Sequence, residues 1–225
     1  MTQTQSFAQR TAASFARRDP FWPAQLTVLA AIALSVDLPS SLTIQNVWLL
    51  PAIEGVLLVA LVVSGPRRGV SHRQRRRFAL GLVGLVSASN LVNLGLLVHV
   101  LLHKSSAVHG RQLILAGMEI WITNVLLFTV WYWQLDRGGP MARKEAVLQA
   151  PDFYFQQMTD EHLGGLGWRA GYIDYFYTSF TNATAFSPTD TMPLTPMAKM
   201  LMAIQSGASL LTIGLVLARA VNILA

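Results

Sequence analysis

The amino-acid sequence predicts an all-α polytopic membrane protein with about five transmembrane helices. It also predicts a re-entrant helix and loop before the last span. Of the 225 residues, 52% are hydrophobic and only 12% are charged, and the charges gather between long apolar runs. Before the last apolar run stands an aromatic and hydroxyl-rich segment followed by a polar strip. Such an order is typical of a segment that enters a bilayer and returns, with its irregular backbone covered by protein or water.

Composition divides the chain into four regions. Residues 1–20 form a basic N-terminal segment, which is either an interfacial helix on anionic lipid or a frayed tail. Residues 21–135 form a four-helix transmembrane region, and residues 136–170 form a polar connection. Residues 171–225 contain the pore-like helix, the loop and the last transmembrane helix.

The boundaries of the first four spans follow from the apolar runs and from the residues that interrupt them. The fourth span ends in a Trp-Tyr-Trp run, which indicates an aromatic anchor at a membrane interface, and the segment Asp136–Pro140 stops it. A short helix is expected over Ala142–Gln149, and Thr191–Pro196 is expected to be a turn before a long helix, Ala198–Leu224. The four spans are Trp22–Leu38, Leu42–Ser64, Phe78–Leu102 and Gln112–Leu135.

Arginine placement predicts the orientation. Six arginines lie between Arg67 and Arg77, in the loop after the second span, and they mark this loop as cytoplasmic. The N-terminus is then cytoplasmic and the C-terminus external, so the pore-like loop lies on the cytoplasmic side. We expect a multi-pass protein of a bacterial inner (plasma) membrane whose partner is the lipid bilayer. The net charge of +6 does not indicate a nucleic-acid partner, because both flanks of the basic loop enter the membrane.

Polar residues inside the predicted spans are functional candidates, because each is unfavourable in lipid. In one interpretation, Glu54 or Glu119 belongs to an ion or proton path. In the other, the amides form interhelical hydrogen bonds and a carboxyl group is protonated or paired with Arg219. One acid per helix is too little to define a relay, which favours the second interpretation. The candidates are Glu54, Asn90, Asn93, Glu119, Asn124 and Arg219.

Signals for catalysis or metal binding are weak. There is no cysteine, which excludes disulfides and thiolate metal sites. His99 and His103 have a spacing that can hold a metal, but two imidazoles alone rarely suffice, and an interfacial role is favoured. No zinc-protease helix motif, phosphate-binding glycine loop or serine elbow is present. The sequence therefore predicts no enzyme, no cofactor and no metal site.

The segment Thr181–Thr195, which reads TNATAFSPTDTMPLT, resembles the pore segment of potassium channels. In those channels a pore helix ends in Thr, a Thr-Val-Gly-Tyr-Gly-Asp filter follows, and a turn of the type x-x-Pro-x-Thr closes the segment. Thr184 and Asp190 match the two ends of the filter pattern, and Pro193 and Thr195 match the turn.

The resemblance covers roughly the last fifty residues. The final helix, with Lys199 near its start and Gly207 near its middle, is similar to the inner helix of those channels. The chain is most similar to an uncharacterised bacterial polytopic membrane-protein family whose C-terminal segment resembles the potassium-channel pore module. That family likewise has an arginine-rich loop after its second span and an aromatic run ending its fourth.

The filter pattern is degenerate. Ser187 and Thr189 occupy the two glycine positions, Pro188 occupies the tyrosine position and Phe186 the valine position. Glycines permit the backbone dihedrals that aim filter carbonyls at an ion, whereas a proline restrains both itself and the residue before it. The resemblance therefore implies a pore-like fold without potassium selectivity. The cytoplasmic placement of the strip is also opposite to that in a potassium channel.

Three functional hypotheses follow, in order of preference. The first is an oligomeric ion channel-like protein, a tetramer by resemblance, in which Ser187, Thr189 and Asp190 line a pore. The second is a structural or accessory subunit of a larger membrane complex that has kept the fold without conduction. The third is a small transporter that uses intramembrane carboxylates. The pore-like residues are Thr184, Ala185, Phe186, Ser187, Pro188, Thr189 and Asp190.

Overall fold

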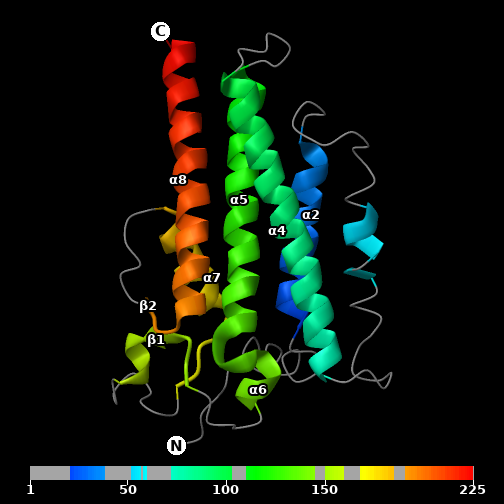
Figure 1. The fold of residues 1–225 in the computed structure, drawn as a ribbon, viewed down its shortest axis with the longest axis vertical. Coiled ribbons are helices and arrows are strands. Elements are labelled where there is room, and N and C mark those ends of the chain that lie inside the picture. The colour runs from blue at the N-terminus through cyan, green and yellow to red at the C-terminus, as the bar shows by residue number, and fades with distance from the viewer. Residues whose placement is uncertain are drawn as a thin grey trace, which may run out of the picture.

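The computed structural model describes residues 21–38, 52–56, 58–59, 72–102, 110–144, 150–159, 168–184 and 191–224. Four long helices dominate it, and α5 lies at their centre, in contact with α2, α4, α7 and α8 (Figure 1). Helix α5 runs antiparallel to the other three long helices. The long helices are α2 (Trp22–Asp37), α4 (His72–Leu102), α5 (Gly110–Leu135) and α8 (Pro196–Leu224).

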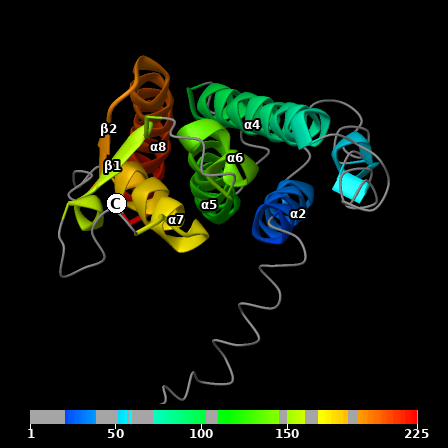
Figure 2. The ribbon, with the colours of Figure 1, turned by 90° about the horizontal axis from the view of Figure 1, so that it is seen from below.

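Short elements gather at the end of the bundle where α5 finishes and where α4 and α8 begin, as Figures 1 and 2 show. The polar connection and the pore-like helix therefore lie at the same end as the arginines that start α4. These elements are η2 (Asp136–Gly138), α6 (Pro140–Lys144), β1 (Phe153–Phe155), η3 (Gln156–Met158), α7 (Tyr172–Ala183) and β2 (Thr191–Pro193).

Of the described helices, three are long and apolar enough to cross a membrane, over Arg76–Leu101, Arg111–Gly138 and Pro196–Val221. At about 1.5 Å per residue, 26 residues extend roughly 39 Å, more than the hydrocarbon core of a bilayer. Helix α2 is also apolar but has 16 residues. The helical class and these three helices agree with the prediction. Most of the expected second span, Leu42–Ser64, lies outside the described residues, so a total of five spans stays a prediction.

Two helix starts differ from their predicted positions for local reasons. Helix α4 begins at His72, before the predicted Phe78, because the intervening arginines are good helix formers and extend the helix beyond its apolar part. Helix α8 begins at Pro196, whose fixed φ suits the first helical position. The Thr195 hydroxyl caps this helix by accepting a hydrogen bond from the Ala198 backbone N–H (3.3 Å).

The predicted stop after the fourth span is confirmed at α5. Three consecutive residues after this helix have positive φ: Arg137 (50°), Gly138 (74°) and Gly139 (100°). Pro140 then opens α6. A Cβ on Gly139 would lie 3.2 Å from the Gln134 carbonyl oxygen, so both the dihedral and the space favour glycine at this position.

A two-stranded sheet departs from the all-α prediction. Thr191–Pro193 was expected within a turn but forms strand β2, which pairs antiparallel with β1, Tyr154 opposite Met192. In β1, Phe153 and Phe155 are buried, so part of the predicted polar connection belongs to the core. Three residues are too few to establish an alternating hydrophobic pattern, so neither strand could be predicted from its own sequence.

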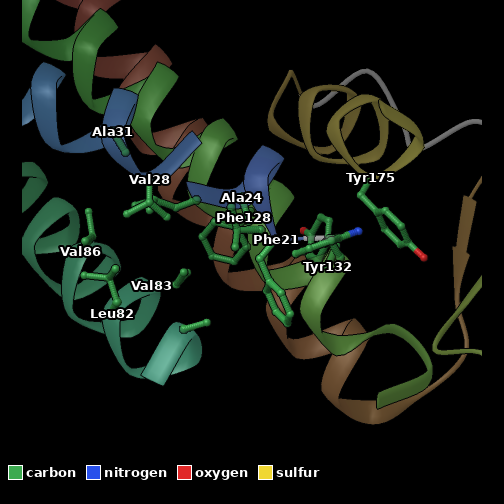
Figure 3. Packing of buried hydrophobic residues seen from close by; sticks show 14 of the residues in the cluster. Phe21, Ala24, Val28, Ala31, Leu82, Val83, Val86, Phe128, Tyr132 and Tyr175 are labelled. Carbon is green, nitrogen blue, oxygen red and sulfur yellow. The ribbon is translucent and has the colours of Figure 1, made fainter. Parts of the chain in front are cut away.

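The main core runs from the α2–α4 contact, through α5, to the short elements (Figure 3). Figure 3 shows Val28 of α2 and Val83 of α4 on one side and Tyr175 of α7 on the other. Tyr132 joins the two parts, and the centroid of its ring lies 5.0 Å from the ring centroid of Phe153. Tyr132 and its neighbour Trp133 are buried in the protein, so the aromatic run that ends α5 packs the core instead of anchoring an interface.

Candidate functional site

Helix α7 packs against both α5 and α8 and extends far along α5. Near its start, the Tyr175 hydroxyl donates to Asp136 just beyond the end of α5 (2.6 Å). At its other end, the Trp121 indole N–H donates to the Ala183 carbonyl (3.3 Å). Trp121 precedes the last residue of α5, Leu135, by 14 residues, or roughly 21 Å along the helix. Helix α7 therefore runs from the polar end of the bundle to about the middle of α5.

The two faces of α7 have the opposite character to those of a surface helix in water. Its exposed face is apolar and aromatic, whereas most of its buried face carries hydroxyl and amide groups. A water-soluble helix normally buries its apolar face. The exposed residues are Ile173, Phe176, Tyr177 and Phe180, and the buried ones are Tyr175, Thr178, Ser179, Asn182 and Ala183.

Gln205 of α8 is the centre of a buried hydrogen-bond network that joins α5, α7 and α8. Its Nε2 donates to the carbonyl (3.0 Å) and the hydroxyl (2.7 Å) of Ser179. Its Oε1 accepts from the Tyr132 hydroxyl and from Asn182 Nδ2 (2.8 Å). Ser179 in turn donates to the carbonyl of Val125 in α5 (2.7 Å). All four hydrogen-bonding positions of the Gln205 amide are used, so the network fixes α7 to both long helices.

Two asparagines extend the network. Asn182 Nδ2 donates to the Met202 carbonyl (3.0 Å), and its Oδ1 accepts from the Ser206 hydroxyl (3.0 Å). Asn124 of α5 donates to the Ser209 hydroxyl (2.8 Å) and to the carbonyl of Gln205 (3.3 Å). Polar contacts therefore continue along the α5–α8 interface.

The last turn of α7 has its carbonyl groups bonded. A helix end leaves four carbonyls without intrahelical partners, and in a buried place each needs another donor. Here the C-cap residue Thr184 and side chains of α5 and α8 supply the donors. The bonds are Thr184 N to Phe180 O (3.1 Å), Thr184 Oγ1 to Thr181 O (2.9 Å) and Trp121 Nε1 to Ala183 O (3.3 Å). The one proton of the Ser206 hydroxyl is shared between the Asn182 carbonyl (3.3 Å) and Asn182 Oδ1 (3.0 Å).

Asp136 anchors the other end of α7. Its carboxylate is 1% exposed and accepts hydrogen bonds from the Tyr175 hydroxyl (2.6 Å) and from the backbone N–H groups of Asp152 (2.9 Å) and Phe153 (3.4 Å). One acid thus connects the end of α5 to α7 and β1.

Arg143 of α6 packs beside this carboxylate, with one nitrogen 4.0 Å from Asp136 Oδ2. It donates to the carbonyls of Trp133 (2.8 Å) and Asp136 (2.7 Å), capping the end of α5 with a positive charge. Its guanidinium lies over the rings of Trp133 and Tyr175. Burial lowers the pKa of Arg143, although Tyr175 and Asp136 oppose this effect. Burial also raises the pKa of the Tyr175 hydroxyl, which stays protonated near neutral pH.

Asp152 forms hydrogen bonds that connect the end of α5 to the start of α8. Its carboxylate accepts from the Arg137 backbone N–H (3.0 Å) and from the Thr195 hydroxyl at the start of α8 (2.8 Å). The Thr191 hydroxyl is 3.1 Å from that of Thr178. Thr178 lies about a turn and a half before the end of α7, so Thr191 stands nearer the polar end than Thr184 does.

The structure describes one of the seven pore-like residues. Thr184 is the C-cap of α7, so this helix ends at the first residue of the predicted filter-like segment. The other six, Ala185, Phe186, Ser187, Pro188, Thr189 and Asp190, lie outside the described residues.

The predicted intramembrane polar residues do not form one cluster. Asn90 donates to the carbonyl of Ile120 (3.3 Å), and Asn124 bonds to α8, so both amides bond across helices. Asn93 is buried, and Glu119 is half-buried next to Ile120. Within the described residues, both carboxylate oxygens of Glu54 and the Nε of Arg219 are buried without a hydrogen-bond partner. The asparagine contacts favour the interhelical interpretation for these two amides.

Sequence reasoning missed the centre of the network. Gln205 is an amide inside a predicted span and satisfies the criterion that selected Asn90 and Asn124, so a stricter use of that criterion would have found it. Asn182 and Ser179 lie three residues apart on one helical face, which is a weaker sign. The sequence did not indicate that Asp136 would bond to α7 and β1, because it showed this residue only as part of a run that stops a helix.

Comparisons with protein-family models, curated proteins and solved structures find no match for this chain. The likeness to the potassium-channel pore segment thus stays a prediction from the sequence.

Proposed function

We propose that this protein is an oligomeric, channel-like integral membrane protein. In this proposal α5, α7 and α8 are its pore-forming unit, and α7 with the segment after it is re-entrant. The observation that carries the proposal is the deep end of α7, which lies beside the middle of α5 with its last four carbonyls bonded. Backbone groups at membrane depth must be satisfied by protein, since lipid offers them no partner.

The exposed apolar face of α7 supports the same interpretation. Ile173 is 73% exposed and Tyr177 is 50% exposed. In water each exposed Å² of apolar surface would be unfavourable by about 25 cal/mol, whereas lipid or another subunit would cover this face. The buried polar side chains of α7 already bond inside the protein. The distribution therefore suits a helix whose surroundings are apolar.

The order of the elements supports the pore-like part of the proposal. In chain order, a long helix (α5), a half-length helix that ends beside the middle of α5 (α7) and a second long helix (α8) occur, with only short elements between them. This is the order that the resemblance implies for an outer helix, a pore helix and an inner helix. Thr191 lies beside Thr178, nearer the polar end than Thr184 at the deep end of α7, as a re-entrant segment requires.

The proposed permeation path uses the degenerate filter. Ser187, Thr189 and Asp190 line it, and Phe186 narrows it. The carboxylate at its mouth attracts cations without selecting potassium. Because α7 lies at the same end as Arg76 and the other arginines that start α4, this mouth faces the cytoplasm in the orientation that the arginines favour.

Oligomeric state and ion flux test the proposal together. The purified protein should form a rotationally symmetric oligomer, a tetramer by resemblance, and should conduct monovalent cations in liposomes that retain an entrapped dye. Asp190→Asn should reduce the preference for cations over anions while leaving the oligomer intact. A protein that is monomeric in several detergents, or that gives no flux in intact liposomes, would contradict the proposal.

An accessory, non-conducting subunit is the second candidate. It is favoured by Pro188 between Ser187 and Thr189, because this sequence leaves neither filter glycine in place. This candidate predicts that a different membrane protein co-purifies in a fixed ratio and that the protein alone gives no flux. A stable ring of this chain alone with an open axial path would exclude it.

A further inference from the structure

Arginines from three elements converge on the end of α5. Arg76 of α4 donates from Nη2 to the Gln134 carbonyl (3.0 Å), and Arg143 of α6 donates to two further carbonyls near this end. Arg137 belongs to η2, which follows α5 directly. The negative end of a helix dipole favours positive charge, which explains why guanidinium groups gather here.

Packing brings Arg76 against the turn that contains Arg137. A Cβ on Gly139, two residues after Arg137, would lie 3.2 Å from Arg76 Nε, so the Arg76 side chain passes close over this turn. Figures 1 and 2 show α6, which follows the turn, at the end of α5 with α4 alongside. Burial is the main cause of the lowered pKa of Arg143, and the like charges of Arg137 and Arg76 add to it. The three positive charges are therefore close enough to repel one another.

The guanidinium groups of Arg76 and Arg137 have few acceptors in the described chain. Arg137 Nη2 lies 3.6 Å from the sulfur of Met158, which is a weak acceptor, and its Nε is buried without a partner. Arg76 Nε is likewise buried without a partner. A charged group that is partly buried is normally paired, so both arginines lack an anion.

The nearby carboxylates do not supply this anion. Asp136 accepts hydrogen bonds from the Tyr175 hydroxyl and from backbone N–H groups, and its ion pair is with Arg143 (4.0 Å). Asp152 accepts from a backbone N–H and from the Thr195 hydroxyl. Within the described residues, neither acid forms an ion pair with Arg76 or Arg137.

Arg137 also keeps its side chain at a position that disfavours one. Its φ is 50°, and the next two residues, which also have positive φ, are glycines. A glycine would suit the backbone at position 137 as well. A non-glycine residue held in this conformation indicates that its side chain has a role.

The two arginines lie where the apolar parts of the helices end. The apolar stretch of α4 begins at Arg76, and that of α5 runs to Gly138, directly after Arg137. Stretches of this length cross the hydrocarbon core, so their ends lie at the level of the lipid headgroups. Phe78, two residues further into the apolar part of α4, is 64% exposed and suits contact with acyl chains. An anion available at this level is the phosphate of a phospholipid.

We propose that this end of the bundle binds headgroups of anionic phospholipids, with Arg76 and Arg137 donating to phosphate oxygens. A planar guanidinium can bond two oxygens of one phosphate at once, which suits arginine to this role. Basic pockets at the cytoplasmic ends of spanning helices are favourable places for such headgroups. Arg143 is a positioning residue, because its bonds to α5 hold the turn from which Arg137 projects. The inference requires a membrane location but is independent of conduction.

Lipid titration of the delipidated, detergent-purified wild type, followed by native mass spectrometry, tests the proposal. Phosphatidylglycerol should bind about tenfold more tightly than zwitterionic phosphatidylcholine, because it carries the net charge that the arginines attract. Equal binding of the two lipids would overturn the proposal. Displacement of phosphatidylglycerol by an equal concentration of inorganic phosphate would indicate a site for free anions and would also overturn it. These comparisons need no variant.

Arg76→Gln and Arg137→Gln test the named donors. Each should weaken phosphatidylglycerol binding by about tenfold, because each removes a charge-assisted hydrogen bond. Arg77→Gln is the matched control, since it removes the same charge from an exposed side chain on the same helix and should weaken binding by less than about threefold. Equal losses in all three variants would show that binding follows surface charge alone.

Glutamine retains a side chain at position 137, so Arg137→Gln leaves the backbone strain of the turn comparable. Size-exclusion elution at the wild-type position would show that this variant is folded. Unchanged affinity for phosphatidylglycerol in the folded Arg137→Gln protein would exclude Arg137 as a donor and overturn the proposed site.

Discussion

Gln205→Leu is the sharpest test of the network that holds α7. Leucine has a similar volume and suits an apolar helix, so the substitution removes the amide without opening a large cavity. The side chain is 0% exposed and makes four hydrogen bonds, two through Nε2 to Ser179 and two through Oε1 from Tyr132 and Asn182. If this network secures α7 as proposed, the variant should be less stable although its helix propensity is no worse.

The size of the effect follows from the groups that stay behind. Ser179 still donates to Val125, and Asn182 still donates to Met202 and accepts from Ser206, so neither side chain is left without a partner. The Tyr132 hydroxyl loses Gln205 Oε1, its one acceptor among the described residues, and an unsatisfied buried donor costs about 1–3 kcal/mol. The other lost interhelical bonds are worth about 0.6 kcal/mol each. We expect Gln205→Leu to reduce the free energy of unfolding by about 3–5 kcal/mol.

Unfolding by titration with a denaturing detergent, followed by circular dichroism, measures this free energy. Gln156→Leu is the control, because Gln156 is exposed in η3 and the same chemical change there should alter the free energy by less than about 0.5 kcal/mol. A Gln205→Leu protein that unfolds within about 0.5 kcal/mol of the wild type would refute the argument that the amide network fixes α7.

Two further predictions concern the end of α5. Gly139→Ala should lower the free energy of unfolding by about 1–3 kcal/mol, because φ is 100° at this position and an alanine is strained there. Gly207→Ala is the control, because its new methyl group meets open space and should be neutral or stabilising. Equal effects of the two substitutions would contradict the argument that backbone strain at position 139 requires glycine. Burial raises the pKa of Tyr175, so its contribution to stability is complete below about pH 10 and is lost at higher pH. Tyr175→Phe should lose the bond to Asp136 and show a weaker alkaline loss of stability, while Tyr177→Phe, at an exposed site, should retain the wild-type pH profile.

The long helices were predictable because each depends on a local property. Apolar runs of more than twenty residues identify α4, α5 and α8 wherever they pack, and Pro196 and the glycines after Arg137 mark helix limits through their own dihedrals. The β1–β2 pair was not predictable. Each strand has three residues and exists through its partner, and the hydrogen bonds of Asp136 and Asp152 help to hold that pair in place.

The candidate site was predictable in position but not in its contacts. The aromatic and hydroxyl composition of the segment before the last helix pointed to α7 and to Thr184 as its end. The sequence could not show that Tyr132, which reads as an interfacial aromatic, turns inward to meet Gln205. Side-chain pairing between helices depends on their relative rotation, and a single sequence contains no direct record of that rotation.

The hydrogen bonds at the deep end of α7 limit where ion selectivity can reside. Its last four carbonyls already accept bonds from Thr184, Ser206 and Trp121, so α7 serves as a scaffold and offers no free set of carbonyls to a permeating ion. In a channel, any selectivity must then come from residues 185–190. Substitutions in the Gln205 network should change stability and assembly without changing ion preference, and substitutions at Ser187 or Asp190 should do the reverse. An accessory subunit would show the first effect alone, so the two classes of variant separate the channel proposal from its alternative.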